Sequence, residues 1–161
     1  MSVGTCAIEG LYTILCRDKD TAAGGLTPSE TVLHASGFYR HFGDRIDILP
    51  GDGIDRKVQI VYEGTSKWTN ISSGSSGTTR MRTFQVVVRV GYFSGDHVDE
   101  TMMIIADDEQ EMVKEIAFST NWPTGCSSGC VNGYVPKTST VKRLDDTRYV
   151  LEITLDVQVT G

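Results

Sequence analysis

The sequence predicts an α+β protein in which an antiparallel (mixed) β-sheet carries two helices packed on one face. Two segments, 81–93 and 149–159, alternate apolar and polar residues with period two, which is typical of half-buried antiparallel strands. Two other segments space their apolar residues as amphipathic helices do. Gly, Ser and Thr supply 48 of the 161 residues, which favours a sheet joined by long loops. This length suits one domain, so we expect residues 1–161 to fold as a single unit.

The first half of the chain predicts one helix and two strands. Residues 5–17 should form the helix, because apolar side chains recur there at three- and four-residue steps (Ile8, Leu11, Tyr12 and Leu15). A short alternating strand is predicted over 45–49, and a longer strand over 56–63.

Residues 64–79 (GTSKWTNISSGSSGTT) are predicted to be a low-complexity loop inside a long hairpin that spans 56–93. Trp68 is the one large aromatic residue of this loop. A tryptophan needs a surface to lie on, so it either folds back on this domain, which we favour, or docks on a neighbour.

The second half of the chain predicts a capped helix and a terminal hairpin. Asp107 is expected to cap the helix, with Gln110 completing a box-like start and the helix ending by Trp122. Residues 121–136 read as a second Gly/Ser loop. The strands 137–144 and 149–159 should then form the hairpin.

Several residues are candidates for contacts with a partner. Arg80, Arg82 and Arg89 lie along the strand 81–93 and its start, where they could form a basic stripe for a negatively charged neighbour or be ordinary sheet charges, the latter being favoured. Trp68 and Trp122 belong to the two loops and complete this set of interaction residues.

No catalytic signature stands out, and we expect no enzyme activity, no cofactor and no metal. The cluster of Asp96, His97, Asp99 and Glu100 could bind a metal or shuttle protons, but it reads better as a solvated turn. Cys126 and Cys130 could form half of a zinc site or a disulfide; free thiols are the favoured state of the cysteines.

Charge and hydropathy bound the partners further. The formal net charge is −6, with no Lys/Arg cluster, which argues against a surface that grips nucleic acid. No apolar run is long enough to span a membrane, and Met1–Gly10 lacks the pattern of a secretory signal. We therefore expect no membrane partner.

The order of elements resembles that of the tail-terminator and neck (head–tail joining) proteins of tailed bacteriophages. The resemblance is one of pattern over residues 5–160: an amphipathic first helix, a long hairpin ending in RTFQVVVRVGYF, a capped helix, and a terminal hairpin closing with YVLEITLDVQV. The loops 64–79 and 121–136 are longer than a minimal member would need.

The resemblance implies a structural virion protein of the tail or neck, assembled in the host cytoplasm, that forms a homo-oligomeric ring, expected to be a hexamer. Such a ring caps the tail tube protein, meets the head-side connector and lets DNA pass without specific binding, which a net negative charge would suit. A ring subunit needs two different surfaces, and the loops 64–79 and 121–136 are expected to be its inter-subunit arms. The alternatives are a tail tube or head–tail adaptor subunit and, from another class, a small metal- or ligand-binding enzyme domain using His97, Asp99 and the cysteine pair.

Overall fold

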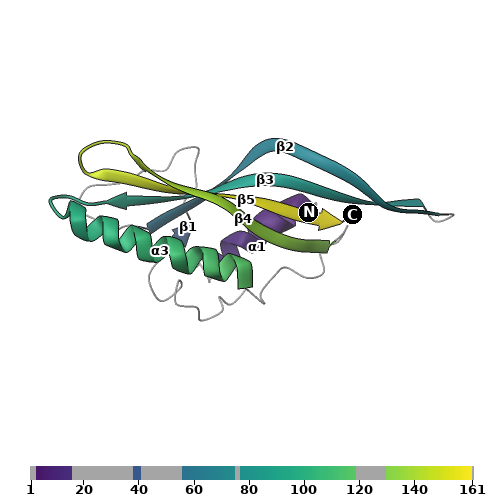
Figure 1. The fold of residues 1–161 in the computed structure, drawn as a ribbon, viewed down its shortest axis with the longest axis horizontal. Helices are drawn as coiled ribbons and strands as arrows, with labels where there is room; N and C mark the ends of the chain where they lie inside the picture. The colour runs from purple at the N-terminus through teal and green to yellow at the C-terminus, as the bar shows by residue number, and fades with distance from the viewer. Residues whose placement is uncertain (1–2, 16–37, 41–55, 75–76, 119–129, 161) are drawn as a thin grey trace.

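A computed structural model describes residues 3–15, 38–40, 56–74, 77–118 and 130–160. These residues form two helices and a five-stranded sheet, which confirms the predicted α+β class. The helices are α1 (Val3–Leu15) and α3 (Val98–Phe118); the strands are β1 (Phe38–Arg40), β2 (Arg56–Gly74), β3 (Gly77–Phe93), β4 (Cys130–Arg143) and β5 (Arg148–Thr160). Both helices lie on the same face of the sheet (Figure 1).

The strand order across the sheet is β1-β2-β3-β5-β4. The strand β1 pairs with β2 in parallel, and the other three pairings are antiparallel, so the sheet is mixed, as expected. The terminal strand β5 therefore lies between β3 and β4, which makes it a central strand. Its period-two burial follows from this position, because only one of its two faces is covered by the helices.

The core lies between the helices and one face of the sheet. The two strongest sequence patterns are confirmed, because the residues predicted to point inward are buried on both strands (Phe84, Val86, Val88, Val90 and Tyr92 on β3; Tyr149, Leu151, Ile153, Leu155, Val157 and Val159 on β5). The helices complete this core with fully buried side chains (Leu11, Ile14 and Leu15 from α1; Ile105, Met112 and Ile116 from α3).

Two tyrosine hydroxyls bind α1 to the sheet. The Tyr12 hydroxyl accepts a 2.7 Å hydrogen bond from the backbone N–H of Ile60 on β2. The Tyr134 hydroxyl, from β4, donates a 2.7 Å bond to the carbonyl of Ala7. Burial of the Tyr134 ring raises the pKa of its hydroxyl well above the ordinary value, so this donor keeps its proton at neutral pH. The first helix is thus bonded to β2 and to β4, which lie on either side of the central strands β3 and β5.

The loop predicted over 64–79 is wrong for the residues that the structure describes. The strand β2 continues to Gly74 and β3 begins at Gly77, with Ser73 facing Thr78 near the tip. The small polar side chains of this segment made it look like a linker. A strand is stabilised by backbone pairing, however, and small polar residues can pair in this way too. Residues 130–136, assigned to the second loop, likewise belong to β4, whose start pairs with the end of β5.

The start predicted for the second helix is also wrong. The helix α3 begins at Val98, directly after a turn in which the His97 N–H donates to the Ser94 carbonyl, so Asp107 lies within the helix and does not cap it. The acidic cluster at 107–108 looked like a first turn. In the fold, Asp108 is buried, where its Oδ2 accepts hydrogen bonds from Tyr92 at 2.8 Å and from Arg56 at 2.7 Å. Hydrophobic patterning treats every carboxylate as exposed to solvent, so it does not predict a buried acid that is paired in this way.

The predicted strand 45–49, Trp122 and the part of the second loop over 121–129 lie outside the described residues. No helix among the described residues is long and apolar enough to cross a membrane.

Candidate interaction surface on the β2–β3 hairpin

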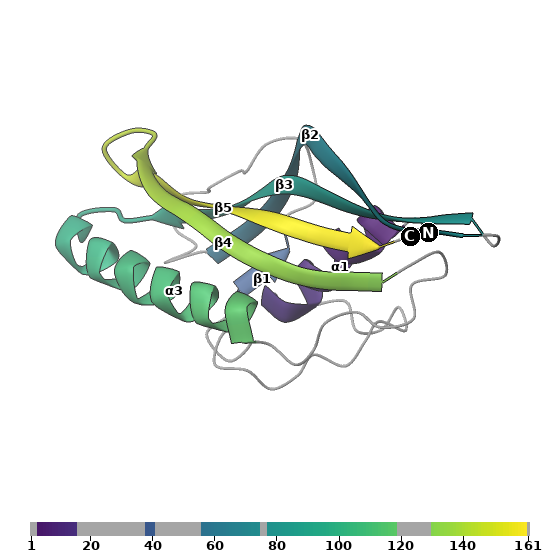
Figure 2. The same ribbon diagram turned by 45° about the vertical axis from the view of Figure 1, so that its right-hand side comes forward.

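The β2–β3 hairpin extends beyond the rest of the sheet. The last pairing between β3 and β5 joins Met81 to Thr160, so the described residues of the hairpin beyond Met81 pair only with each other. Figures 1 and 2 show this end projecting past the helices and the chain end as a two-stranded ribbon. We call the described residues of 62–84 the arm; its base, which includes Arg82, still pairs with β5, and its part beyond Met81 is the two-stranded ribbon.

An irregularity in β2 marks the base of the arm. Tyr62 pairs with Val86, but the next pairing joins Ser66 to Phe84, so two extra residues are inserted into β2. Gly64 takes a φ of 76° within this insertion, a conformation that glycine adopts at little cost. The insertion brings the side chains of Tyr62 and Ser66 together, with their hydroxyl oxygens 2.9 Å apart.

Arg82 connects the side chains at this irregularity. Its Nε donates to the Ser66 hydroxyl at 3.0 Å and its Nη2 donates to the Tyr62 hydroxyl at 2.8 Å. The guanidinium carbon also lies over three aromatic rings, 4.7 Å from the centroid of Phe84, 5.4 Å from that of Trp68 and 5.6 Å from that of Tyr62. We call Tyr62, Ser66, Trp68, Arg82 and Phe84 the Arg82 cluster.

The Arg82 cluster holds a positive charge between aromatic rings with no carboxylate to balance it among the described residues. Within the described part of the chain, the Arg82 guanidinium pairs with no carboxylate and meets only hydroxyls and ring faces. The hydrogen bond with Ser66, and then the bond and charge of Arg82, hold the pKa of the Tyr62 hydroxyl below its ordinary value. The cluster thus favours negative charge near its surface.

An open hollow lies between the Arg82 cluster and the start of α1. Its volume is about 240 Å³, and it is lined by Gly4, Thr5 and Ile8 of α1 and by Tyr62, Arg82 and Phe84. Trp68 beside it is 58% exposed and Tyr62 is 42% exposed. The surface is therefore aromatic, cationic and open to a partner.

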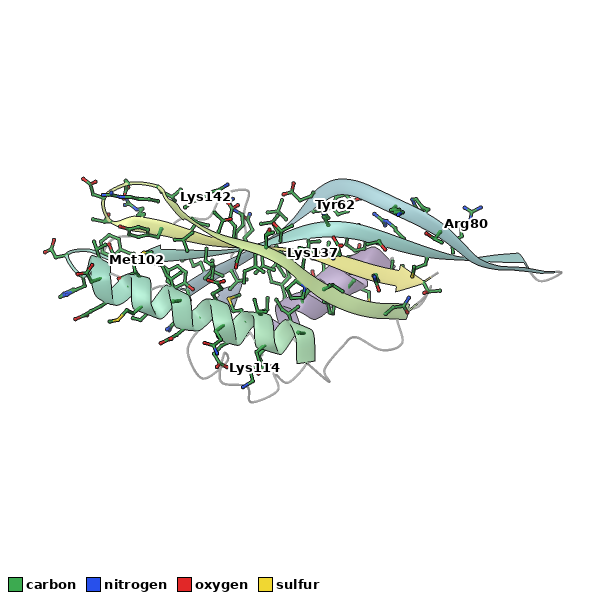
Figure 3. The ribbon with its side chains drawn as sticks, in the orientation of Figure 1. Tyr62, Arg80, Met102, Lys114, Lys137 and Lys142 are labelled. Carbon is green, nitrogen blue, oxygen red and sulfur yellow. The ribbon has the colours of Figure 1, made fainter. Side chains whose placement is uncertain are left out.

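The structure brings only some of the predicted interaction residues together. Trp68 contacts Arg82 of its own chain, as the favoured reading has it, yet most of the indole remains exposed. Arg80 is exposed on the arm and follows the same alternation as Arg82 (Figure 3). Arg89 lies on the opposite face, with its Nε 3.3 Å from Glu152. The three arginines therefore form no single stripe.

Sequence reasoning missed Tyr62 and Ser66 as members of the site. Tyr62 had the alternation of an ordinary strand residue, and Ser66 belonged to the supposed linker. Gly64 directly between them was the available signal, because an isolated glycine in a strand often marks a bulge.

The start of α3 carries a second exposed surface. Met103 is 65% exposed and Met102 is 38% exposed. Asp99, Glu100 and Asp107 are exposed and lie four residues before, three before and four after Met103, which places them around it on the same side of the helix. We call these five residues the Met103 patch.

The described candidate metal-binding residues do not come together as a site. The His97 and Glu100 side chains are exposed and lie 3.9 Å apart, with His97 directly before α3 and Glu100 in its first turn, which matches the interpretation of this cluster as a solvated turn. Among the described residues, no group of three or more His, Cys, Asp or Glu could hold a metal ion.

The expectation of free thiols is wrong for Cys6, which is disulfide-bonded.

Neither a protein-family model nor a curated protein sequence matches this chain. The interaction surfaces therefore have to be interpreted from their own geometry.

Proposed function

We propose that this chain is a structural virion protein of a tailed phage, a ring-forming subunit that terminates the tail tube and joins it to the head-side connector. The observation that carries the proposal is the arm, a hairpin that leaves the two-layer body and exposes an aromatic and cationic surface. The order of elements along the chain, which resembles tail-terminator and neck proteins, supplies the particular role.

The arm suits a subunit that is completed by its neighbours. An isolated two-stranded ribbon is marginally stable in water, so residues beyond Met81 gain stability when another chain covers them. Trp68 is large and mostly exposed, and burying it against a neighbour would stabilise the contact. Both features are typical of arms exchanged between subunits.

The strand β4 offers a second surface for assembly. It is the last strand of the sheet, and residues 137–143 are exposed along it. An edge of this kind can pair with a strand of another subunit. A terminator contacts the tube and the connector as well as its ring neighbours, and β4 lies on a different part of the molecule from the arm (Figure 2), so both surfaces can be in contact at once.

The sheet face away from the helices suits a wall that DNA passes without binding. Three of its cations are paired: Arg89 and Lys142 lie 3.3 and 3.1 Å from Glu152, and Lys137 lies 3.6 Å from Asp156. Paired cations release few counterions from DNA, so they add little affinity. The formal charge of −6 acts in the same direction.

The test combines purified protein with tail tubes of the same phage that lack their terminator. We expect electron microscopy to show one ring at the end of each tube, and native mass spectrometry to show a closed homo-oligomer, alone or released from tubes. Many stacked rings per tube would assign a tube subunit instead. Binding to the connector without binding to tubes would assign an adaptor. A stable monomer with no affinity for tubes would overturn the proposal.

A further inference from the structure

The arm and the start of α3 expose surfaces of opposite character. The arm carries Arg80 and Arg82 on the face of the Arg82 cluster, and Glu63 is the only carboxylate in the sequence from 62 to 84. The Met103 patch carries three exposed carboxylates around two methionines. A chain with a net charge of −6 thus concentrates unpaired positive charge at one place and negative charge at another.

The two surfaces lie at opposite ends of the molecule. Figure 3 labels Arg80 near the outer part of the arm and Met102 near the start of α3. Figures 1 and 2, drawn from different directions, both keep the end of the arm and the start of α3 at opposite extremes. One chain therefore cannot bring its own two surfaces together.

We propose that the arm of one copy of this chain docks on the Met103 patch of a second copy. The occupant of the arm surface is then another molecule of the same protein, and charge complementarity identifies it. The proposal rests on the proposed ring only for the closure of the assembly; the pairwise contact stands on the two surfaces.

The chemistry of the two surfaces matches. The exposed indole of Trp68 can lie against the thioether of Met103, a favourable contact between sulfur and an aromatic ring. Arg80 and Arg82 gain the carboxylate partners that neither has among the described residues of its own chain, while Asp99 and Glu100 gain cations. Arg82 is already oriented by Ser66 and Tyr62, so little side-chain freedom is lost on docking.

The contact is heterologous, because the two partners use different surfaces. Each bound copy leaves one free arm and one free patch, so the contact repeats until the assembly closes into a ring. An isologous dimer, in which two arms or two patches meet, is disfavoured by the repulsion of like charges.

The test uses two full-length variants that each remove one surface. The arm variant carries Trp68→Ala and Arg80→Glu, and the patch variant carries Met103→Lys. All three substitutions are at exposed positions, and thermal unfolding checks that each variant folds. We expect wild type to associate in native mass spectrometry and sedimentation velocity. Each variant alone should stay monomeric at concentrations at which wild type associates, because we expect its dissociation constant for self-association to rise at least about tenfold.

Mixing the two variants gives the decisive result. The intact arm of the patch variant can still dock on the intact patch of the arm variant, but that pair has no further matching surface. We therefore expect a 1:1 heterodimer and no larger species.

The control variants change charge nearby without touching either surface. Lys67→Glu lies on the same strand as Trp68 but follows the opposite alternation. Lys114→Glu lies on α3 about 16 Å along the helix from Met103. Both controls should associate as wild type does.

Three outcomes overturn the proposal. Association that survives in both variants places the contact elsewhere and leaves a ring subunit possible. Loss of tube binding by the arm variant with association intact assigns the arm to the tube protein. A wild type that stays monomeric at every concentration removes the contact between copies, whereas the terminator role fails only if that monomer also does not bind tail tubes.

Discussion

At the scale of single residues, Asp108 shows how burial changes the meaning of a charge. Its carboxylate bonds Arg56 of β2 and Tyr92 of β3, so one side chain of α3 connects two strands to the helix. Burial and the nearby Asp108 charge raise the pKa of the Tyr92 hydroxyl well above its ordinary value, so that hydroxyl remains a donor.

Removing the Asp108 carboxylate should be strongly destabilising. Asp108→Ala leaves the buried Tyr92 hydroxyl without its acceptor and deprives Arg56 of its ion pair, so we expect a loss of roughly 3–5 kcal/mol in the free energy of unfolding. Urea denaturation measures this. The exposed neighbour Asp107 is the matched control, and Asp107→Ala should change the same quantity by less than about 0.5 kcal/mol. Equal effects of the two substitutions would contradict the buried network.

Gly64 sustains the bend at the base of the arm. An added Cβ would have room, since its nearest neighbour is Tyr62 Cε1 at 4.0 Å, but the φ of 76° strains any L side chain. We expect Gly64→Ala to lower the free energy of unfolding by about 1 kcal/mol, measured by chemical denaturation. Gln85→Ala, an exposed position opposite the insertion, should be nearly neutral. A neutral Gly64→Ala would show that the insertion does not need this conformation.

At the scale of elements, Asp145 makes several of the bonds that define the turn between β4 and β5. Asp145 accepts bonds from the Thr147 N–H at 2.9 Å and from Arg148 at 2.6 Å. The Thr147 bond first, and then Arg148, lower the pKa of Asp145 to about 2. The turn thus begins the central strand β5 at a defined residue, Arg148.

This turn should respond to acid in a defined window. The folded pKa of Asp145 lies below the unfolded value near 3.9, so its contribution to stability is complete above that value. The contribution is lost as the pH falls toward 2. Carboxyl NMR should give a midpoint of about 2 for Asp145, and Thr147→Pro, which removes the N–H donor, should raise it. A midpoint at the ordinary Asp value in the wild type would contradict the turn geometry.

The helix α3 illustrates why element boundaries were harder to predict than element types. Its buried side includes Thr101 and Asp108 between apolar residues such as Ile105 and Met112. Two polar residues on the inner side interrupt the apolar spacing, so only the second half of the helix looked amphipathic. The partners of Asp108 come from β2 and β3, which no local pattern contains.

At the scale of the whole molecule, the Cys6 disulfide adds a covalent link to the packing of α1. Cys6→Ser should release its partner thiol, so thiol titration of the denatured, unreduced protein should count one more thiol than in wild type. We also expect a fall of about 2–4 kcal/mol in the free energy of unfolding. The control is Thr5→Ser, one position earlier, which should leave the thiol count unchanged. A count one lower in Cys6→Ser than in wild type would show that the bond is absent, because a free Cys6 thiol would then have been removed.

Part of the candidate site was predictable from the sequence and part was not. Trp68 stood out as the one large aromatic residue of a Gly/Ser-rich stretch, and Arg80 and Arg82 stood out as basic residues along a predicted strand of an acidic chain. The Arg82 cluster did not, because the insertion around Gly64 moves Ser66 opposite Phe84, a register that depends on the partner strand. Met103 was missed because its helix was expected to begin later.

The sequence by itself determined the α+β class, the inward face of β3 and β5, and the first helix, because period-two and helical spacing are local records of which side is buried. Tertiary structure alone decided that the polar residues after Tyr62 continue as a strand, that Asp108 lies in the core, and that Cys6 is bonded. Those outcomes depend on backbone pairing and on contacts between distant segments. The hydrophobic pattern of a single segment predicts neither of them.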